Sequence, residues 1–156
     1  MIVRDARWPD VDALVALIQQ RRRDLAAFDP RFWRPSDRAE AHTRRFYRWL
    51  LLTGRATFLL TEQDGQILAF LTARRVKAPP VYDPGGITIL VDDFCVASPE
   101  LWPTAGSLLL DALRARGRQR QWRQMIIAAP AADRAELELL RRHELTHTTS
   151  WWTAAF

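Results

Sequence analysis

Two adjacent acids, Asp92 and Asp93, interrupt an apolar, β-prone run between Leu90 and Ala97. An uncompensated carboxylate is costly to bury, so a pair of them in such a run needs a purpose. A carboxylate held beside a substrate can take up a proton as a general base. The alternative is structural, with either acid capping a turn or pairing with an arginine. Because consecutive strand residues point to opposite faces, we predict that one acid lines a cleft and the other meets solvent or a helix layer.

The same run leads into a turn and then into a helix. Ser98 and Pro99 end the β-prone stretch, Pro103 and Gly106 follow, and an apolar run begins at Leu108. A turn that feeds a helix N-terminus gathers unpaired backbone N–H groups at the positive end of the helix dipole. Such an arrangement suits an anion such as a pyrophosphate. The stretch therefore predicts a cofactor seat.

Basic side chains gather at the end of this helix and just beyond it, at positions 114, 116, 118, 120 and 123. They suit a phosphate group, through bidentate contacts, or a nucleic acid. No nucleic-acid motif accompanies them, and 18 acids dilute the charge to a net +5, so nucleic acid ranks last among the partners considered. His143 and His147 follow a later helix, where a lone histidine is more often structural than catalytic.

The composition is that of a globular chain without a visible targeting segment. Hydrophobic residues make up 48% and charged residues 26% of the 156 positions, which suits one domain with a full core. A single cysteine excludes an intramolecular disulfide and a thiolate zinc cage. The start, MIVRDARWPD, has no long apolar run, and no run in the chain could span a bilayer. We therefore expect a bacterial-type cytoplasmic protein without a membrane partner.

Hydrophobic periodicity gives the order of the elements that position these residues. Helical spacing of apolar residues from Val11 to Ile18 predicts a first helix packed on a core. Asp64-Gly65 between two apolar runs predicts a β-hairpin. The Thr- and Trp-rich end, 144–156, predicts a final strand or hairpin. The order β-α-α-β-β-β-α-β-α-β indicates one α+β domain, 1–156, with a mixed, mostly antiparallel twisted sheet flanked by helices.

Taken together, these motifs resemble the GNAT superfamily of acyl-CoA-dependent N-acetyltransferases. The resemblance covers nearly the whole chain: an opening strand and helix, the Asp-Gly hairpin, the strand DDFCVASPE, the helix LLLDALRARGR, and a terminal helix and strand. It implies the GNAT fold and acetyl-CoA, or another acyl-CoA, as acyl donor. It also implies a primary amine of a small molecule or a protein as acceptor, without naming that acceptor.

The family's most diagnostic motif, Q/R-x-x-G-x-G/A, holds the CoA pyrophosphate on backbone amides. Aligned on the Leu-Leu that follows, the motif falls on Leu101–Gly106, and of its defining positions only Gly106 matches. Thr104 stands at the middle glycine, and Pro103 removes one backbone donor. The hydroxyls of Thr104 and Ser107 would substitute as donors. The resemblance thus assigns cofactor binding to Leu101, Thr104, Ala105, Gly106 and Ser107.

In the family, a bulge in the fourth strand separates it from the fifth, and the pantetheine pairs with the exposed strand edge. Here Phe94, Cys95 and Val96 would supply that edge, although they can equally be ordinary sheet residues. The backbone N–H of Val96 would be the oxyanion donor. Asp92 or Asp93 would relay the amine's proton through water.

The family often places a tyrosine in the last helix to protonate the departing thiolate. That position is Leu140 in this chain, so the usual acid is absent. His143 and His147 lie nearby in the sequence, and either would have to substitute. The resemblance therefore assigns His143 as a candidate acid.

Two other functions stay open at this point. The altered turn and the missing tyrosine are also typical of a catalytically impaired GNAT-like binding or regulatory domain, with a pocket occluded by Trp102. A nucleic-acid-binding module would instead use the arginines between 114 and 123. Trp151 and Trp152 would place one ring inward and one outward on the final strand, and an exposed ring there would mark a homodimer face.

Overall fold

An open, five-stranded sheet forms the centre of the molecule, with strand order β1-β2-β3-β4-β5. The computed structural model describes residues 1–154. Neighbours are antiparallel from β1 to β4, whereas β5 runs parallel to β4. The strands are β1 (Ile2–Asp5), β2 (Ala56–Gln63), β3 (Gln66–Val76), β4 (Ile87–Val96) and β5 (Trp122–Ile127). This confirms the mixed, mostly antiparallel sheet expected from the sequence.

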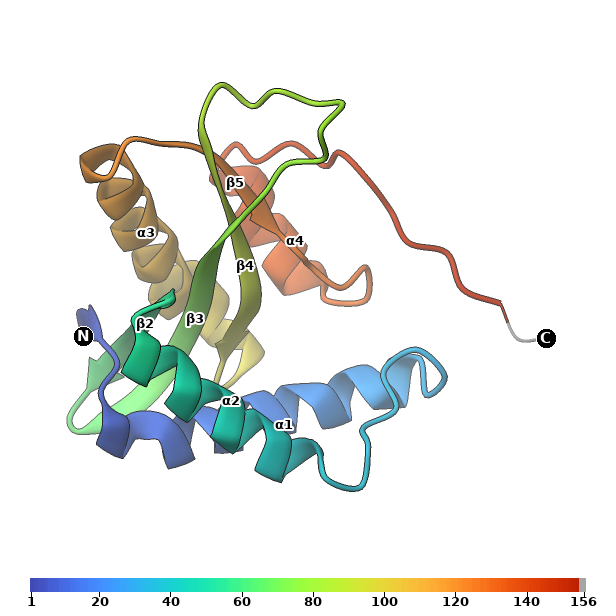
Figure 1. The fold of residues 1–156 in the computed structure, drawn as a ribbon. Coiled ribbons are helices and arrows are strands. Elements are labelled where there is room, and N and C mark those ends of the chain that lie inside the picture. Colours follow the sequence, from blue (N-terminus) through green and yellow to red (C-terminus); the bar gives the residue numbers. More distant parts are fainter. Residues whose placement is uncertain (155–156) are drawn as a thin grey trace.

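Helices cover both faces of this sheet, two on each (Figure 1). On one face, α1 (Val11–Phe28) and α2 (Ala39–Thr53) bury apolar side chains against Phe70 and Cys95. On the other face, α3 (Ser107–Gln119) and α4 (Arg134–Arg142) pack on Leu71 and Phe94. The α+β class expected from the sequence is confirmed, and each face has a core of its own.

The hairpin of β2 and β3 turns at the predicted dipeptide. Gln63 pairs with Gln66, and Asp64 and Gly65 between them have φ values of 52° and 77°. Both angles lie in the left-handed region, which a two-residue hairpin turn of this type requires and Asp-Gly tolerates best. The turn fixes the register of the two central strands.

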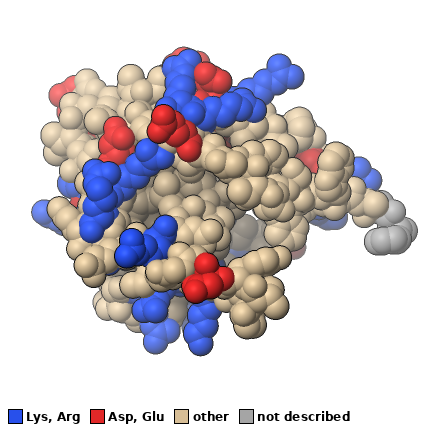
Figure 2. Space-filling model, turned by 90° about the horizontal axis from the view of Figure 1, so that it is seen from above, with Lys and Arg blue, Asp and Glu red and all other residues tan. Residues whose placement is uncertain are grey.

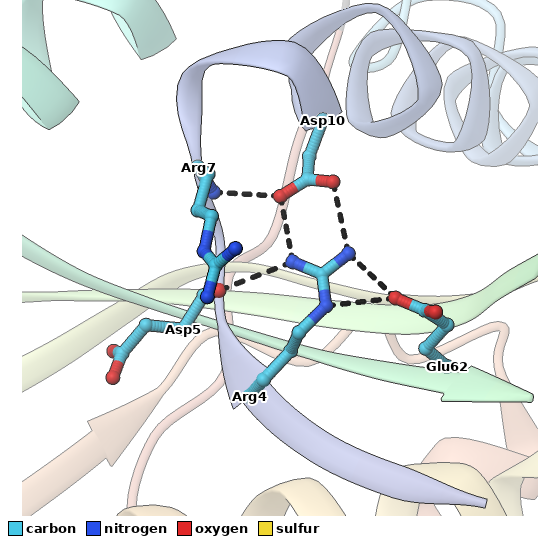
Figure 3. A network of polar contacts seen from close by, with 5 residues as sticks. All are labelled: Arg4, Asp5, Arg7, Asp10 and Glu62. Carbon is cyan, nitrogen blue, oxygen red and sulfur yellow. Dashed lines mark hydrogen bonds and ion pairs between the residues drawn. The ribbon is translucent and has the colours of Figure 1, made fainter. Parts of the chain in front are cut away.

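Arg4 ties the edge of the sheet to the start of α1 (Figure 3). Its guanidinium donates to both carboxylate oxygens of Asp10, at 2.8 and 3.0 Å, and to Glu62 of β2 at 2.7 Å. Asp10 also accepts the Arg7 backbone N–H at 2.6 Å. The Arg4 contacts lower the pKa of Asp10, so the network stays charged at neutral pH.

The predicted final strand is wrong for the residues that the structure describes. After α4 the chain has no regular element up to Ala154, and Figure 1 shows it leading away from the sheet. Trp151 and Trp152 are 85% and 94% exposed. Thr and Trp favour strands through packing against cross-strand neighbours, and this segment has none, so the propensity is not realised. The two rings do not alternate across a sheet, and the homodimer face stays a prediction.

Within residues 1–154, no helix combines the length and apolarity needed to cross a membrane.

Candidate functional site

β4 contains the irregularity that separates it from β5. Thr72 of β3 pairs with Asp93, and the next residue, Ala73, pairs with Val91, so Asp92 is an extra residue in β4. Such a β-bulge bends its strand and increases the local twist. On its other side, β4 pairs with β5 only as far as Val91. The two strands therefore part beside the bulge.

Beyond the bulge, β4 has one unpaired edge. The Ala97 N–H donates to the Leu68 carbonyl of β3 at 2.7 Å. Because such bonds alternate along an antiparallel pair, the N–H groups of Phe94 and Val96 point away from β3. No strand among the described residues pairs with β4 on that side. The edge that the resemblance assigns to pantetheine is therefore free of backbone pairing.

Asp92 and Asp93 lie on the same face of the sheet, not on opposite faces as predicted. Arg74, which shares the α1 and α2 face with Phe70, donates to both carboxylate oxygens of Asp92. Tyr47 of α2 donates its hydroxyl to Asp93 at 2.8 Å. The prediction assumed a regular strand, and the inserted residue changes the alternation of side chains.

Asp93 is enclosed between α1, α2 and the sheet. Its second carboxylate oxygen lies 4.0 Å from the Arg22 guanidinium of α1. Burial raises the pKa of Asp93, although the Tyr47 hydrogen bond and Arg22 act in the opposite direction. Burial also raises the pKa of Tyr47, so this hydroxyl remains the donor. The sequence analysis missed Tyr47, but its spacing from Thr43 and Leu50, on the buried side of α2, was a usable signal.

The chain after β4 is already helical where the resemblance expects a phosphate-binding loop. A 3₁₀ turn covers Pro99–Leu101, a π-helical turn covers Trp102–Gly106, and α3 continues directly from Ser107. The Ser107 N–H donates to the Trp102 carbonyl, and the Trp102 N–H donates to the Pro99 carbonyl. These amides are used within the helical turns, so they are not available to a pyrophosphate.

Trp102 fills the space beside this turn. Its side chain is 1% exposed, and its ring meets that of Phe94 edge to face, with centroids 4.8 Å apart. A Cβ on Gly106 would lie 2.8 Å from the Trp102 ring and 3.1 Å from Leu139 of α4. Gly106, which matches the family motif, thus makes room for a tryptophan in this chain. Ala105 is also fully buried.

The other residues assigned to the cofactor make internal contacts. Leu101 is half-buried, and the exposed Thr104 directs its hydroxyl to the Leu101 carbonyl at 3.4 Å. The hydroxyl of Ser107 lies 2.8 Å from Nε2 of His143. His143 thereby connects the end of α4 to the start of α3. It lies in the layer of these two helices, whereas Asp92 and Asp93 face the other layer.

A buried ion cluster lies where β4 and β5 part. Arg21 of α1 donates to Asp133 at 2.7 Å and to Glu136, both at the start of α4. The same guanidinium lies 5.2 Å from the centre of the Trp102 ring. Since α1 and α4 cover opposite faces of the sheet, this contact passes the unpaired edge of β4. Arg21 and Trp102 therefore occupy the space beside that edge.

Glu136 is the most deeply buried acid of this cluster. It has no exposed surface, and its Oε1 has no hydrogen-bond partner among the described residues. Burial raises its pKa to about 8, although Arg21 acts in the opposite direction. Asp133, by contrast, caps α4 by accepting the Glu136 N–H at 2.9 Å.

The surface next to the cluster is hollowed between the 3₁₀ turn and α4. This cavity has a volume of about 180 Å³ and is lined in part by Glu100, Glu138 and Arg142. Arg142 is bound to Glu138 at 3.0 Å. Carboxylates at this position disfavour a polyanion such as a pyrophosphate.

Comparison with known proteins identifies the fold. No family model and no curated protein matches the sequence. A mutant of the BH1408 protein from Bacillus halodurans superposes with a TM-score of 0.83 at 17% identity, covering 100% of this chain and 99% of that one. A predicted acetyltransferase from Clostridium acetobutylicum, crystallised with acetyl-CoA, gives 0.74 at 17% identity over 99% and 95% of the two chains. An aminoglycoside 6′-N-acetyltransferase from Acinetobacter haemolyticus gives 0.73 at 13% identity over 100% and 98%.

The chain has the GNAT fold. Within this GNAT fold, the residues present fit the pantetheine part of an acyl-CoA but not its pyrophosphate. The unpaired edge at Phe94–Val96 suits pantetheine, provided that Arg21 moves aside. The turn at Trp102–Gly106 suits the pyrophosphate poorly, because Pro103 has no N–H, the Trp102 and Ser107 amides are used within the turns, and the Trp102 side chain fills the adjoining space.

Proposed function

We propose that the protein is an acyl-CoA-dependent N-acyltransferase that transfers an acetyl or other acyl group to a primary amine. The supporting observation is the parting of β4 and β5, which leaves the edge at Phe94–Val96 unpaired beside the half-buried Asp93. A bulge and an unpaired strand edge inside a sheet forgo backbone hydrogen bonds, so they cost stability. A binding role for the edge offsets that cost.

Three groups of the chain would carry the reaction. A bound acyl-CoA supplies the activated thioester carbonyl. The Val96 N–H would donate to the carbonyl oxygen as negative charge develops there. Asp93, with its raised pKa, would accept the proton of the amine through water, while Tyr47 holds its carboxylate in place. The C–N bond would form as the C–S bond of the thioester breaks, and the thiolate would leave as part of CoA and take a proton from water. Asp92 is the weaker candidate because Arg74 binds both of its oxygens.

A second function, that of a non-catalytic GNAT-like binding domain, is favoured by the contents of the site. The Trp102 ring and the ion pair of Arg21 with Glu136 take up the space beside the edge. Glu100 and Glu138 also face the adjoining cavity. On this account, the chain retains the GNAT fold but no longer binds an acyl-CoA.

Isothermal titration with acetyl-CoA at millimolar concentration separates the two proposals. An acyltransferase gives saturable heat with the wild type and tighter binding with Arg21→Ala, because the loss of the guanidinium empties the space beside β4. Arg23→Ala changes an exposed arginine of the same helix and serves as the matched control. Release of CoA in the presence of a panel of primary amines then tests turnover. If neither the wild type nor Arg21→Ala binds acetyl-CoA, the acyltransferase proposal is overturned and the binding domain remains.

A further inference from the structure

The outward side of α2 carries a groove that the proposed acyl transfer does not use. We call it the α2 groove: it has a volume of about 400 Å³ and is lined by Ala41, Arg44, Arg45, Arg48, Trp49 and Leu52. α2 packs on the sheet through Thr43, Tyr47 and Leu50. Helical spacing places the lining residues on the opposite side, where polar residues are the rule.

Aromatic side chains are unusually prominent along this groove. Trp49 is 43% exposed, and the neighbouring Phe46 is 45% exposed. Their rings stack with an interplanar angle of 20° and centroids 6.0 Å apart. The Arg55 guanidinium lies over Trp49, 5.3 Å from the ring centre. Trp49 therefore joins the groove to a flat aromatic surface that is bordered by positive charge.

The arginines of the groove differ in how far they are neutralised. Arg44 is bound to Asp12 and Glu40, both at 2.8 Å. Arg45 and Arg48 have no carboxylate within ion-pair distance among residues 1–154. The Arg48 guanidinium lies over the Trp8 ring, 5.3 Å from its centre, and its Nε is buried without a hydrogen-bond partner. The groove therefore combines two cations that have no carboxylate partner with a stacking surface.

We propose that the α2 groove binds a single-stranded nucleic acid, with phosphates on Arg45 and Arg48 and a base against the Phe46–Trp49 pair. Single-strand-binding proteins combine these same elements, a basic groove and aromatic side chains on which bases stack. The net charge of +5 favours the approach of a polyanion. This proposal does not depend on acyl transfer.

Two features favour a nucleic acid over an anionic membrane or an acidic peptide. Phe46 and Trp49 lie against each other with an interplanar angle of 20°, so together they form one flat surface and do not protrude singly for insertion into lipid. Arg45 and Arg48 line the same groove as Trp49, and this juxtaposition of cations and an aromatic ring matches the alternation of phosphate and base along one strand. An acidic peptide offers the charge but no planar partner for the aromatic pair.

The test must separate this groove from the general basic character of the molecule. Figure 2 shows Lys and Arg side chains spread over the face seen from above, with acidic side chains among them. The arginines at the C-terminal end of α3 belong to this background. A double substitution there, Arg118→Ala with Arg120→Ala, removes the same charge as Arg45→Ala with Arg48→Ala and is the matched control.

Fluorescence anisotropy with a fluorescein-labelled oligo(U) of about 15 nucleotides measures the binding. We expect salt-dependent binding that weakens at least about fivefold in Trp49→Ala and in the Arg45→Ala, Arg48→Ala pair. Trp49→Phe, which retains a stacking ring, is expected to bind as the wild type does. The control pair is expected to weaken binding less than about twofold, and circular dichroism verifies that each variant is folded.

Four outcomes overturn the proposal. One is the absence of binding to oligo(U) at low salt. Another is an equal loss in the control pair, which would show unspecific attraction to charge. A third is equal or tighter binding of a duplex of the same length, which would exclude base stacking. The last is a preference for phosphatidylserine-containing vesicles over oligo(U), which would assign the groove to a membrane.

Discussion

Arg21 holds together residues from three separate parts of the chain. Its guanidinium contacts Asp133 and Glu136 of α4 and lies over the Trp102 ring. Breaking a buried ion pair by removing one partner is costly, because the other charge is left uncompensated. When Arg21 is removed, Glu136 becomes neutral by binding a proton and leaves no uncompensated charge of its own, since burial has already raised its pKa to about 8. The protonation state of this one carboxyl therefore couples the site to pH.

Glu136 makes the stability of the protein fall as the pH rises. Its pKa is about 8 in the folded protein, against an ordinary value of 4.5. Between these values the folded protein retains a proton that the unfolded chain releases, so the free energy of unfolding decreases with rising pH. Glu136→Gln removes this titration, and we expect the decrease between about pH 5 and about pH 8 to shrink by about 3 to 4 kcal/mol.

Urea denaturation at several pH values from about 5 to about 8 measures this effect. Glu138→Gln makes the same substitution on an exposed turn of α4 and should keep the wild-type profile. Parallel profiles for the wild type and Glu136→Gln would show that Glu136 is ionised throughout this range.

At the scale of elements, the turn from β4 into α3 is shaped by packing. Glycine in a helical segment ordinarily loses about 1 kcal/mol relative to alanine. Gly106 nevertheless stands in the helical run after β4, between the Trp102 ring and Leu139. A glycine is needed at position 106 because α4 and the Trp102 ring approach this turn closely, and helix propensity would instead favour alanine.

Gly106→Ala accordingly sets two effects against each other. Propensity favours the alanine, but its Cβ would lie 2.8 Å from the Trp102 ring, and overpacking of this kind costs about 1 to 3 kcal/mol. We expect net destabilisation of about 1 kcal/mol or more, measured as a lower urea midpoint. In a Trp102→Leu background the cost of Gly106→Ala should largely disappear, because the ring that it meets is gone. A stabilising Gly106→Ala would contradict the packing described for this turn.

The elements also show which features the sequence could predict. Local chemistry sufficed for the hairpin, because Asp64-Gly65 favours one turn type wherever it stands between apolar runs. The bulge at Asp92 could not be read from the residues, since one inserted residue leaves the apolar pattern on both sides intact and only the partner strand reveals it. The final strand failed because strand formation needs a neighbour, and Trp151 and Trp152 have none.

The candidate site was predictable to a similar extent. The family resemblance placed Phe94–Val96 on an edge, and the structure leaves that edge unpaired. It also suggested Trp102 as an occluding residue, and that ring is buried beside the turn. Arg21 escaped notice because its partners are more than a hundred positions away, at |i−j| of 112 and 115. A run of arginines in an amphipathic helix is usually solvated, so only tertiary contacts distinguish Arg21 from Arg23.

At the scale of the whole molecule, the two helix layers are joined around the free edge of β4. α1 lies on one face and α4 on the other, and the ion pairs of Arg21 connect them where β5 no longer pairs with β4. A second tie, between Arg116 of α3 and Asp5 of β1 at 2.6 Å, lies at the opposite edge of the sheet. Whether the space beside β4 is closed depends on the ion pairs of Arg21 with Asp133 and Glu136, which are the first tie between the layers.

Loss of the first tie should loosen one part of the molecule and leave the rest unchanged. In Arg21→Ala, α4 keeps its apolar contacts with α3 but is no longer held to α1, so local opening of α4 and β5 becomes easier. We expect faster amide hydrogen exchange in α4 and β5 and unchanged exchange in the β2–β3 hairpin, measured by mass spectrometry. Arg116→Ala breaks the tie at the opposite edge and should leave α4 as protected as in the wild type. Uniform acceleration across all strands would mean that Arg21 contributes to global stability alone, and the closed space beside β4 would then have no separate means of opening.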